Sequence, residues 1–154
     1  MRVLLISANT ERLTMVTIPL GLGLVAAALR RAGHEVEFLD LLAAPEPDAA
    51  VREAAASFGP DAIGVSVRNI DDQCAREPKL LLERAKGVVE ACRACTSSPV
   101  VLGGAGYSMF PREALAYLGA DYGVRGDGEE AFPSLLERLE RGGDVRGIPG
   151  VHAA

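Results

Sequence analysis

The chain has 154 residues, of which 49% are hydrophobic, and a formal net charge of -5 at pH 7. This length and apolar content predict one globular domain with a two-sided core. Lys and Arg are scattered and form no basic stripe, which excludes nucleic acid as a partner. No apolar run reaches the roughly 20 residues of a membrane span, and the start turns polar at Ser7, too early for a secretory signal. We therefore expect a cytoplasmic protein with no membrane partner.

Strands and helices alternate in the first half of the chain. Continuous apolar runs predict strands over residues 2–8, 36–40 and 61–67. Apolar residues at helical spacing predict a helix that begins at Pro19 and ends before Gly33. A second helix is predicted over residues 45–58, beginning near Asp48.

The second half repeats the alternation. Helices are predicted over residues 77–95 and 108–118, and strands over 99–102 and 120–125. A last helix runs to about residue 141, and its start carries a capping box made by Asp127 and Glu130. Residues 142–154 are glycine-rich and weakly patterned, which is typical of a linker or frayed end. We expect one domain over residues 1–141 and a linker or tail over 142–154.

Three cysteines, Cys74, Cys92 and Cys95, have no disulfide-framework spacing, in agreement with a reducing compartment. Cys92 and Cys95 form a Cys-x-x-Cys pair, the spacing of some metal and redox sites. The pair ends a predicted helix and has no second pair or histidine nearby. We therefore expect no metal ligands in this chain.

The alternation predicts a doubly wound, five-stranded parallel sheet of flavodoxin-like or Rossmann-like type, with helices on both faces. Such folds bind ligands beyond the carboxyl ends of the strands, near the point where strand order reverses. Four polar or glycine-rich loops fall at that edge, over residues 7–12, 66–72, 103–108 and 126–130. The opposite edge carries plain connectors. This asymmetry predicts a ligand site at the carboxyl edge.

The chemistry available in these loops is limited. None of them contains a histidine, and Ser66 and Ser108 have no evident activating base. Asp71 and Asp72 are an acidic pair, but the acidic residues of a response-regulator site are missing after the first and third strands. A Walker-type phosphate loop is also absent. Backbone amides, small side chains and hydroxyls remain, which suits a large cofactor held by shape and many weak hydrogen bonds.

Several motifs follow one another in the order of a known family. They are Pro19-Leu20-Gly21-Leu22, residues 26–36, Gly103-Gly104, residues 111–115 and Gly126-Asp127-Gly128-Glu129. Together they resemble the amino-terminal cobalamin-binding domain of cobalamin-dependent radical SAM enzymes. The closing residues 147–151 resemble the segment where that family leaves this domain for its catalytic barrel.

The resemblance implies cobalamin as the cofactor and assigns roles to particular residues. Ser66 matches a serine that helps to line the pocket for the dimethylbenzimidazole nucleotide tail, and Gly103 and Gly104 match a glycine pair that lets the tail pass beside the sheet. A larger residue at either glycine is expected to block the tail and leave the fold intact. Asn9 and Thr10 lie where the broader fold has a cobalt-ligating histidine loop, so the resemblance implies base-off cobalamin without a protein imidazole.

We also expect Arg68 or Asn69 to approach the lower corrin face and to exclude or order an axial water. The alternative is that Arg68 pairs with Asp71 or Asp72 on the surface. The full set of residues expected to bind the cofactor is Asn9, Thr10, Leu20, Gly21, Ser66, Val67, Arg68, Asn69, Gly103, Gly104, Gly106, Tyr107, Gly126, Asp127, Gly128 and Glu129.

The Cys-x-x-x-Cys-x-x-Cys loop that holds an iron-sulfur cluster in radical SAM enzymes is absent from this sequence. The chain alone is therefore not expected to be catalytic. The cluster and S-adenosylmethionine are expected in a radical SAM domain, joined in cis or acting in trans, and the parent enzyme is expected to be a methyltransferase. The alternatives are a flavodoxin-like domain that binds FMN and a ligand-free protein-interaction module.

Overall fold

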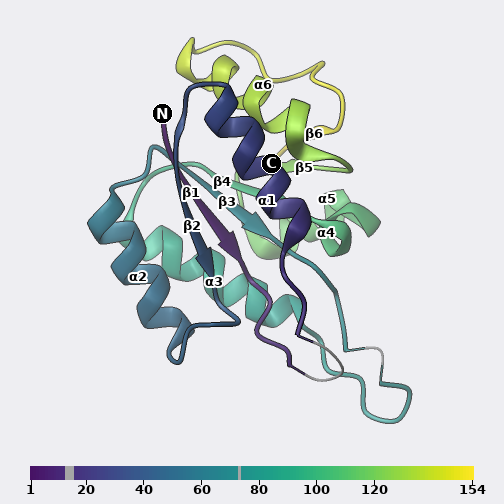
Figure 1. The fold of residues 1–154 in the computed structure, drawn as a ribbon. Helices are drawn as coiled ribbons and strands as arrows, with labels where there is room; N and C mark the ends of the chain where they lie inside the picture. Colours follow the sequence, from purple (N-terminus) through teal and green to yellow (C-terminus); the bar gives the residue numbers. More distant parts are fainter. Residues whose placement is uncertain (13–15, 73) are drawn as a thin grey trace.

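The computed structural model describes residues 1–12, 16–72 and 74–154, and within them lies a six-stranded sheet with strand order β2-β1-β3-β4-β5-β6 (Figure 1). The first five strands pair in parallel, and the sixth is antiparallel to its neighbour. The strands are β1 (Arg2–Ser7), β2 (Glu35–Asp40), β3 (Ala62–Ser66), β4 (Val100–Gly103), β5 (Tyr122–Val124) and β6 (Val151–Ala153).

Helices cover both faces of the sheet, so β1 is buried along almost its whole length. One face packs on α1 (Leu20–Arg31) and α6 (Gly128–Glu140), and the other on α2 (Pro47–Phe58), α3 (Leu82–Cys95) and α5 (Pro111–Leu118). Alternating residues of β1 divide the core, because Leu5 belongs to the α1 and α6 side and Leu4 to the α2 and α3 side. The predicted two-sided core is confirmed.

Two predicted helices differ from the structure because local hydrogen bonds and prolines override the apolar spacing. The helix expected over 77–95 begins at Leu82, since the Asp72 carboxylate accepts the amide hydrogens of Cys74 and Lys79 and folds the preceding segment into a turn. The helix expected over 108–118 is two helices, α4 (Ala105–Met109) and α5, because Pro111 starts a new helix.

The structure also corrects one predicted helix start and one predicted helix cap. The helix expected over 45–58 begins at Pro47, in the first-turn position that proline favours. Asp127 is the N-cap residue of α6 as predicted, but its side chain makes no capping hydrogen bond, so the predicted capping box is wrong. No helix in the described part of the chain is long and apolar enough to cross a membrane.

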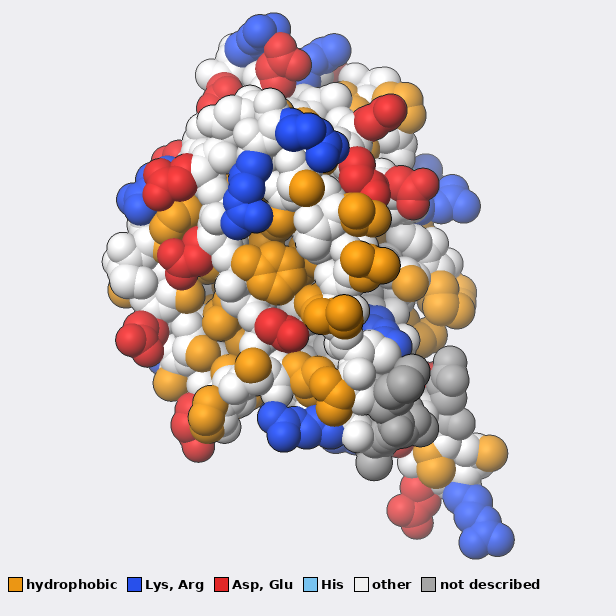
Figure 2. Space-filling view, viewed as in Figure 1, with side chains coloured by type: hydrophobic (Ala, Val, Ile, Leu, Met, Phe, Trp, Pro, Cys, Tyr) orange, Lys and Arg blue, Asp and Glu red, His pale blue; other side chains and the backbone are white. Residues whose placement is uncertain are grey.

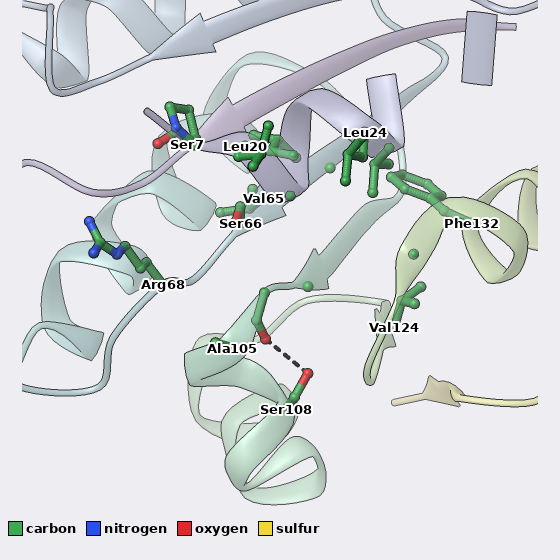
Figure 3. Close-up of a pocket in the computed structure, with 18 of the residues that line it drawn as sticks. Ser7, Leu20, Leu24, Val65, Ser66, Arg68, Ala105, Ser108, Val124 and Phe132 are labelled. Carbon is green, nitrogen blue, oxygen red and sulfur yellow. Dashed lines mark hydrogen bonds between the residues drawn. The ribbon is translucent and has the colours of Figure 1, made fainter. Parts of the chain in front are cut away.

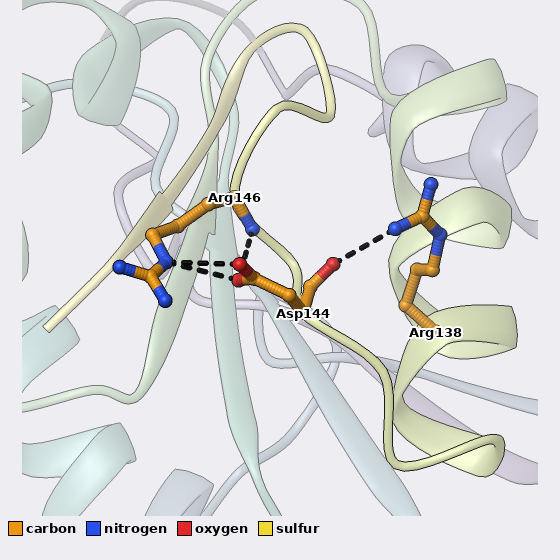
Figure 4. A network of polar contacts seen from close by, with 3 residues as sticks. All are labelled: Arg138, Asp144 and Arg146. Carbon is orange, nitrogen blue, oxygen red and sulfur yellow. Dashed lines mark hydrogen bonds and ion pairs between the residues drawn. The ribbon is translucent and has the colours of Figure 1, made fainter.

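The predictions of a five-stranded sheet and of a linker or frayed end over residues 142–154 are wrong at residues 151–153, which form β6 beside β5. The connector before β6 is held by Asp144, whose backbone carbonyl accepts a hydrogen bond from Arg138 and whose carboxylate pairs with Arg146 at 3.0 Å (Figure 4). Val145 and Ile148 pack against the core between the sheet and α6. The division into residues 1–141 and 142–154 remains a prediction.

Candidate functional site

A cavity of about 600 Å³ opens at the carboxyl edge of the sheet and runs inward between the sheet, α1 and α6. We call this cavity the slot. Its floor is the face of β1, β3 and β4, beside the point where strand order reverses between β1 and β3. Figure 3 shows its lining side chains, among them Ser66, Leu24 and Phe132, which come from a strand and both helices. The predicted position of the ligand site agrees with this cavity.

Strand register arranges the floor of the slot in two rows. Ser7, Ser66 and Gly103 are neighbours across β1, β3 and β4 at the edge of the sheet. Two residues further in on each strand, Gly64 and Val101 are neighbours below the serine and the glycine. Because side chains alternate along a strand, both rows face the same side of the sheet. The floor is therefore polar and small at the mouth, and apolar inside.

The two serine hydroxyls at the mouth are available to a ligand. Ser7 is 4% exposed, and its register partner Ser66 is partly exposed. Within the described residues, neither hydroxyl makes a hydrogen bond to another part of the chain. Two neighbouring hydroxyls without protein partners are suited to hold polar atoms of a ligand.

The glycine pair after β4 has two different roles. A β-carbon on Gly104 would lie 2.6 Å from the carbonyl oxygen of Val67, and Gly104 has a φ of 93°, so glycine is required there by the fold itself. A β-carbon on Gly103 would have Val124 O, at 3.8 Å, as its nearest neighbour, and would face the slot. The expectation that either glycine can be enlarged with the fold intact is therefore wrong for Gly104.

Loops around the mouth are tied together by Ser108 and Arg68. The Ser108 hydroxyl donates to the carbonyl of Gly104 at 2.9 Å and accepts the amide hydrogen of Gly126 at 3.0 Å, which joins α4 to the loop before α6. On the other side, the Arg68 guanidinium donates a hydrogen bond to the Thr17 hydroxyl, in the segment before α1. Arg68 thereby joins the tip of β3 to the segment before α1.

Hydrophobic side chains are exposed near the same mouth. Ile18, Leu20 and Leu24 are 86%, 69% and 49% exposed, and all three line the slot. Figure 2 shows hydrophobic side chains gathered along α1 on this face. The mouth is therefore suited to contact an apolar surface of a ligand as well as its polar groups.

The structure brings most of the predicted site residues to the slot. Thr10, Val67 and Asn69 instead line a second cavity of about 20 Å³ on the α3 side, which Asn9 and Arg68 also border. Gly106 is buried where a β-carbon would lie 3.1 Å from the backbone of Asn69, and Tyr107 belongs to the core on the α2 and α3 side. The predicted residues that line the slot are Asn9, Leu20, Gly21, Ser66, Arg68, Gly103, Gly104, Gly126, Asp127, Gly128 and Glu129.

Sequence reasoning missed the inner part of the slot. Val25, Val101, Val124 and Phe132 line it, but their apolar side chains look like ordinary core in the sequence. The usable signal was the alternation along the strands, which places Gly64 on the same face as Ser66.

Neither of the two histidines in the sequence lines the slot. His34 directly precedes β2, and its Nδ1 lies 3.3 Å from the amino-terminal nitrogen. Burial lowers the pKa of this histidine. Cys92 is buried, and burial raises the pKa of its thiol to about 12, while Cys95 is exposed. No group of three or more His, Cys, Asp or Glu side chains in the described residues is placed to hold a metal ion.

The comparisons with known proteins agree on one family. The family model for the B12 binding domain matches residues 6–136. The chain is 33% identical over 136 residues to tryptophan 2-C-methyltransferase of Streptomyces laurentii, covering 86% of this chain and 23% of the relative. It is 34% identical over 137 residues to hopanoid C-3 methylase of Methylococcus capsulatus, covering 86% of this chain and 24% of the relative. The chain thus spans about a quarter of the length of these curated relatives.

Solved structures lead to the same family. The radical S-adenosylmethionine methyltransferase TsrM from Kitasatospora setae, with cobalamin and a 4Fe-4S cluster bound, matches with a TM-score of 0.91 and 33% identity over 99% of this chain and 27% of that chain. The cobalamin-dependent enzyme OxsB shares the fold, with a TM-score of 0.73 and 20% identity over 97% of this chain and 20% of that chain. Because the family model covers most of the sequence and relatives above 30% identity cover 86% of it, the chain belongs to the B12-binding domain family.

Proposed function

We propose that the chain holds cobalamin with the nucleotide tail in the slot and the corrin ring at the carboxyl edge of the sheet. The observation that carries the proposal is the slot itself, a cavity of about 600 Å³ with free hydroxyls at its mouth and an apolar interior. This combination fits a tail that has a polar ribose and phosphate and an apolar base. Bound cobalamin would supply a cobalt centre that can accept and donate a methyl group.

Particular residues are assigned to parts of the tail. Ser66 and Ser7 donate or accept hydrogen bonds at the mouth, since their hydroxyls are neighbours in the strand register. Gly103 leaves the space beside β4 open, and the loop of Gly126 and Asp127 forms the opposite border. The remaining predicted residues of the slot act as its walls.

Cobalt is proposed to have no imidazole ligand from this chain, because neither histidine lies at the slot. Arg68 and Asn69 follow β3 after Val67 and are the side chains proposed to lie near the lower corrin face, where they would exclude or order water. The guanidinium of Arg68 already has a fixed partner in Thr17, which would hold it at the mouth before the cofactor arrives.

The domain is proposed to work as the cofactor module of a longer radical SAM methyltransferase. Relatives at about 33% identity are four times as long as the matched region, and their names describe methyl transfer. An iron-sulfur cluster and S-adenosylmethionine would then be held by a radical SAM domain outside these 154 residues. Methyl transfer would be the activity of that whole protein.

The direct test is to mix the purified chain with hydroxocobalamin, desalt it and record its visible spectrum. We expect a retained corrin band at one equivalent per chain, and loss of most of this band in Gly103→Val, whose side chain would enter the slot. A parallel sample with flavin mononucleotide tests the flavodoxin alternative. A colourless wild-type protein that has the circular dichroism spectrum of a folded α/β domain would refute the proposal.

A further inference from the structure

The inner end of the slot is closed by one aromatic ring. A β-carbon on Gly64 would lie 2.7 Å from Phe132 Cε1 and 2.7 Å from Leu5 Cδ2, so the Phe132 ring lies directly over the bare backbone of β3. Phe132 comes from α6 and is 5% exposed (Figure 3). The Phe132 ring therefore limits the depth of the slot at this end.

Four apolar side chains, Val25, Val101, Val124 and Phe132, line this inner end. Val101 comes from β4, Val124 from β5 and Val25 from α1. Val25 lies against the start of α6, because a β-carbon on Gly128 would be 2.9 Å from Val25 Cγ2. The strand backbones beneath them are hydrogen-bonded to each other in the parallel sheet. Ser7 and Ser66 lie one row nearer the mouth, and Asp127 and Glu129 line the slot at the start of α6.

We propose that this inner end selects corrinoids by the base of their nucleotide tail, preferring an apolar benzimidazole over a purine such as adenine. Adenine has an exocyclic amine and pyrimidine-ring nitrogens that benzimidazole lacks, and at this depth these groups would lie beside Val101, Val124 or Phe132 and would lose their hydrogen bonds to water. The methyl groups of dimethylbenzimidazole would instead be buried against these apolar side chains. This inference rests on the proposed function, since it concerns the same slot.

The test is to measure the affinity of the chain for three corrinoids by the same spectroscopic titration. They are cobalamin, its analogue with adenine as the tail base, and cobinamide, which lacks the nucleotide tail. We expect cobalamin to bind at least tenfold more tightly than the other two. If cobalamin and the adenine analogue bind equally and both bind more tightly than cobinamide, the selectivity is refuted while the proposed function stands. If cobinamide binds as well as cobalamin, the slot does not hold the tail, and the proposed function fails with the selectivity. If none of the three binds, the proposed function itself fails.

A matched pair of variants tests whether Val101 contributes to the selection. Val101→Thr places a hydroxyl of similar volume at the inner end, whereas Val100→Thr makes the same change one residue away on the opposite face of β4. We expect the ratio of the affinity for cobalamin to the affinity for the adenine analogue to fall at least threefold in Val101→Thr. In Val100→Thr this ratio should stay the same. Val25→Thr, on a half-buried helical position, repeats the test if thermal unfolding shows that Val101→Thr does not fold. Unchanged preference in the folded slot variant would overturn this assignment.

Discussion

Tyr107 occupies the space that a side chain at Gly123 would need. A β-carbon on Gly123 would overlap the Tyr107 hydroxyl and lie 2.8 Å from its Cε2. Tyr107 is fully buried in α4, the short helix that carries Ser108. Because Ser108 in turn holds the loop of Gly126 at the mouth of the slot, the contact of Tyr107 with β5 fixes the position of one border of the site.

The first prediction concerns Gly123→Ala. The added methyl group would push Tyr107 out of its place, so we expect the free energy of unfolding to fall by about 1–3 kcal/mol. Urea denaturation measures this change. Gly87→Ala is the matched control, because nothing lies within 4 Å of a β-carbon there and Gly87 is inside α3, where alanine stabilises a helix by up to about 1 kcal/mol. Equal stability of Gly123→Ala and wild type would contradict the contact.

The second prediction concerns pH and Tyr107. Burial raises the pKa of the Tyr107 phenol from 10 to about 12, so the folded state keeps this proton more tightly than the unfolded state. The contribution of the protonated Tyr107 phenol to the free energy of unfolding is fully present below pH 10 and is lost as pH rises from 10 to 12. Over this interval the free energy of unfolding of Tyr107→Phe should fall by about 2 kcal/mol less than that of wild type.

The measurement for Tyr107→Phe is the free energy of unfolding at pH 8 and at steps up to pH 12. The thiol of Cys92 also has a raised pKa, of about 12, but it is present in both proteins and cancels in the difference. At pH 8 the variant should be at least as stable as wild type, because the buried Tyr107 hydroxyl has no hydrogen-bond partner in the described structure. Parallel alkaline profiles for the two proteins would show that Tyr107 titrates normally.

The third prediction separates the two glycines after β4. Gly103→Val should keep the thermal unfolding temperature within a few degrees of wild type and lose cobalamin, because the new side chain has open space in the slot. Gly104→Val should lose cobalamin and should also have a free energy of unfolding lower by about 2 kcal/mol or more. The new side chain would clash with the Val67 carbonyl, and the backbone at this position has a positive φ. A stable Gly104→Val protein would show that the β3 and β4 loops can move apart.

The sequence was sufficient to predict the parallel core of the fold and the edge where the site lies. Continuous apolar runs such as residues 2–8 and 61–67 identify strands covered on both faces, and loops after those strands must meet at one edge. Ser66 could be placed there because it lies near the end of one such run, and Gly103 because it directly follows another. Their neighbouring position in the sheet depends on strand register, which the sequence does not state.

Other features depend on contacts between distant residues and could not be predicted. Residues 151–153 form a three-residue strand that exists because β5 offers an open edge, and no local pattern marks it. Tyr107 lies outside the slot because its ring occupies the space beside Gly123 of β5, and these two residues are 16 positions apart in the chain (123 − 107). Such pairings are visible only when both partners are placed in space.

The fourth prediction concerns the serines at the mouth. Ser66→Ala should weaken cobalamin binding by about three- to tenfold, which corresponds to the loss of one hydrogen bond. Ser7→Ala should weaken binding by the same factor or by less, and the double variant should bind cobalamin more weakly than either single variant. Ser134→Ala is the control, because that hydroxyl donates to the Glu130 carbonyl on the surface of α6. Titration with hydroxocobalamin measures all four proteins, and unchanged affinity in the double variant would remove both serines from the site.

The last prediction concerns Arg68, whose guanidinium is held by Thr17 at the mouth of the slot. If Arg68 lies near the lower corrin face, Arg68→Ala should admit water to that face and alter the visible spectrum of the bound cofactor. Thr17→Val removes the hydrogen bond but keeps the guanidinium, so it should leave the spectrum closer to that of wild type and affect mainly the rate of binding. Asn69→Ala tests the neighbouring side chain in the same way. Spectra that coincide for Arg68→Ala, Asn69→Ala and wild type at equal occupancy would place both side chains away from the cobalt.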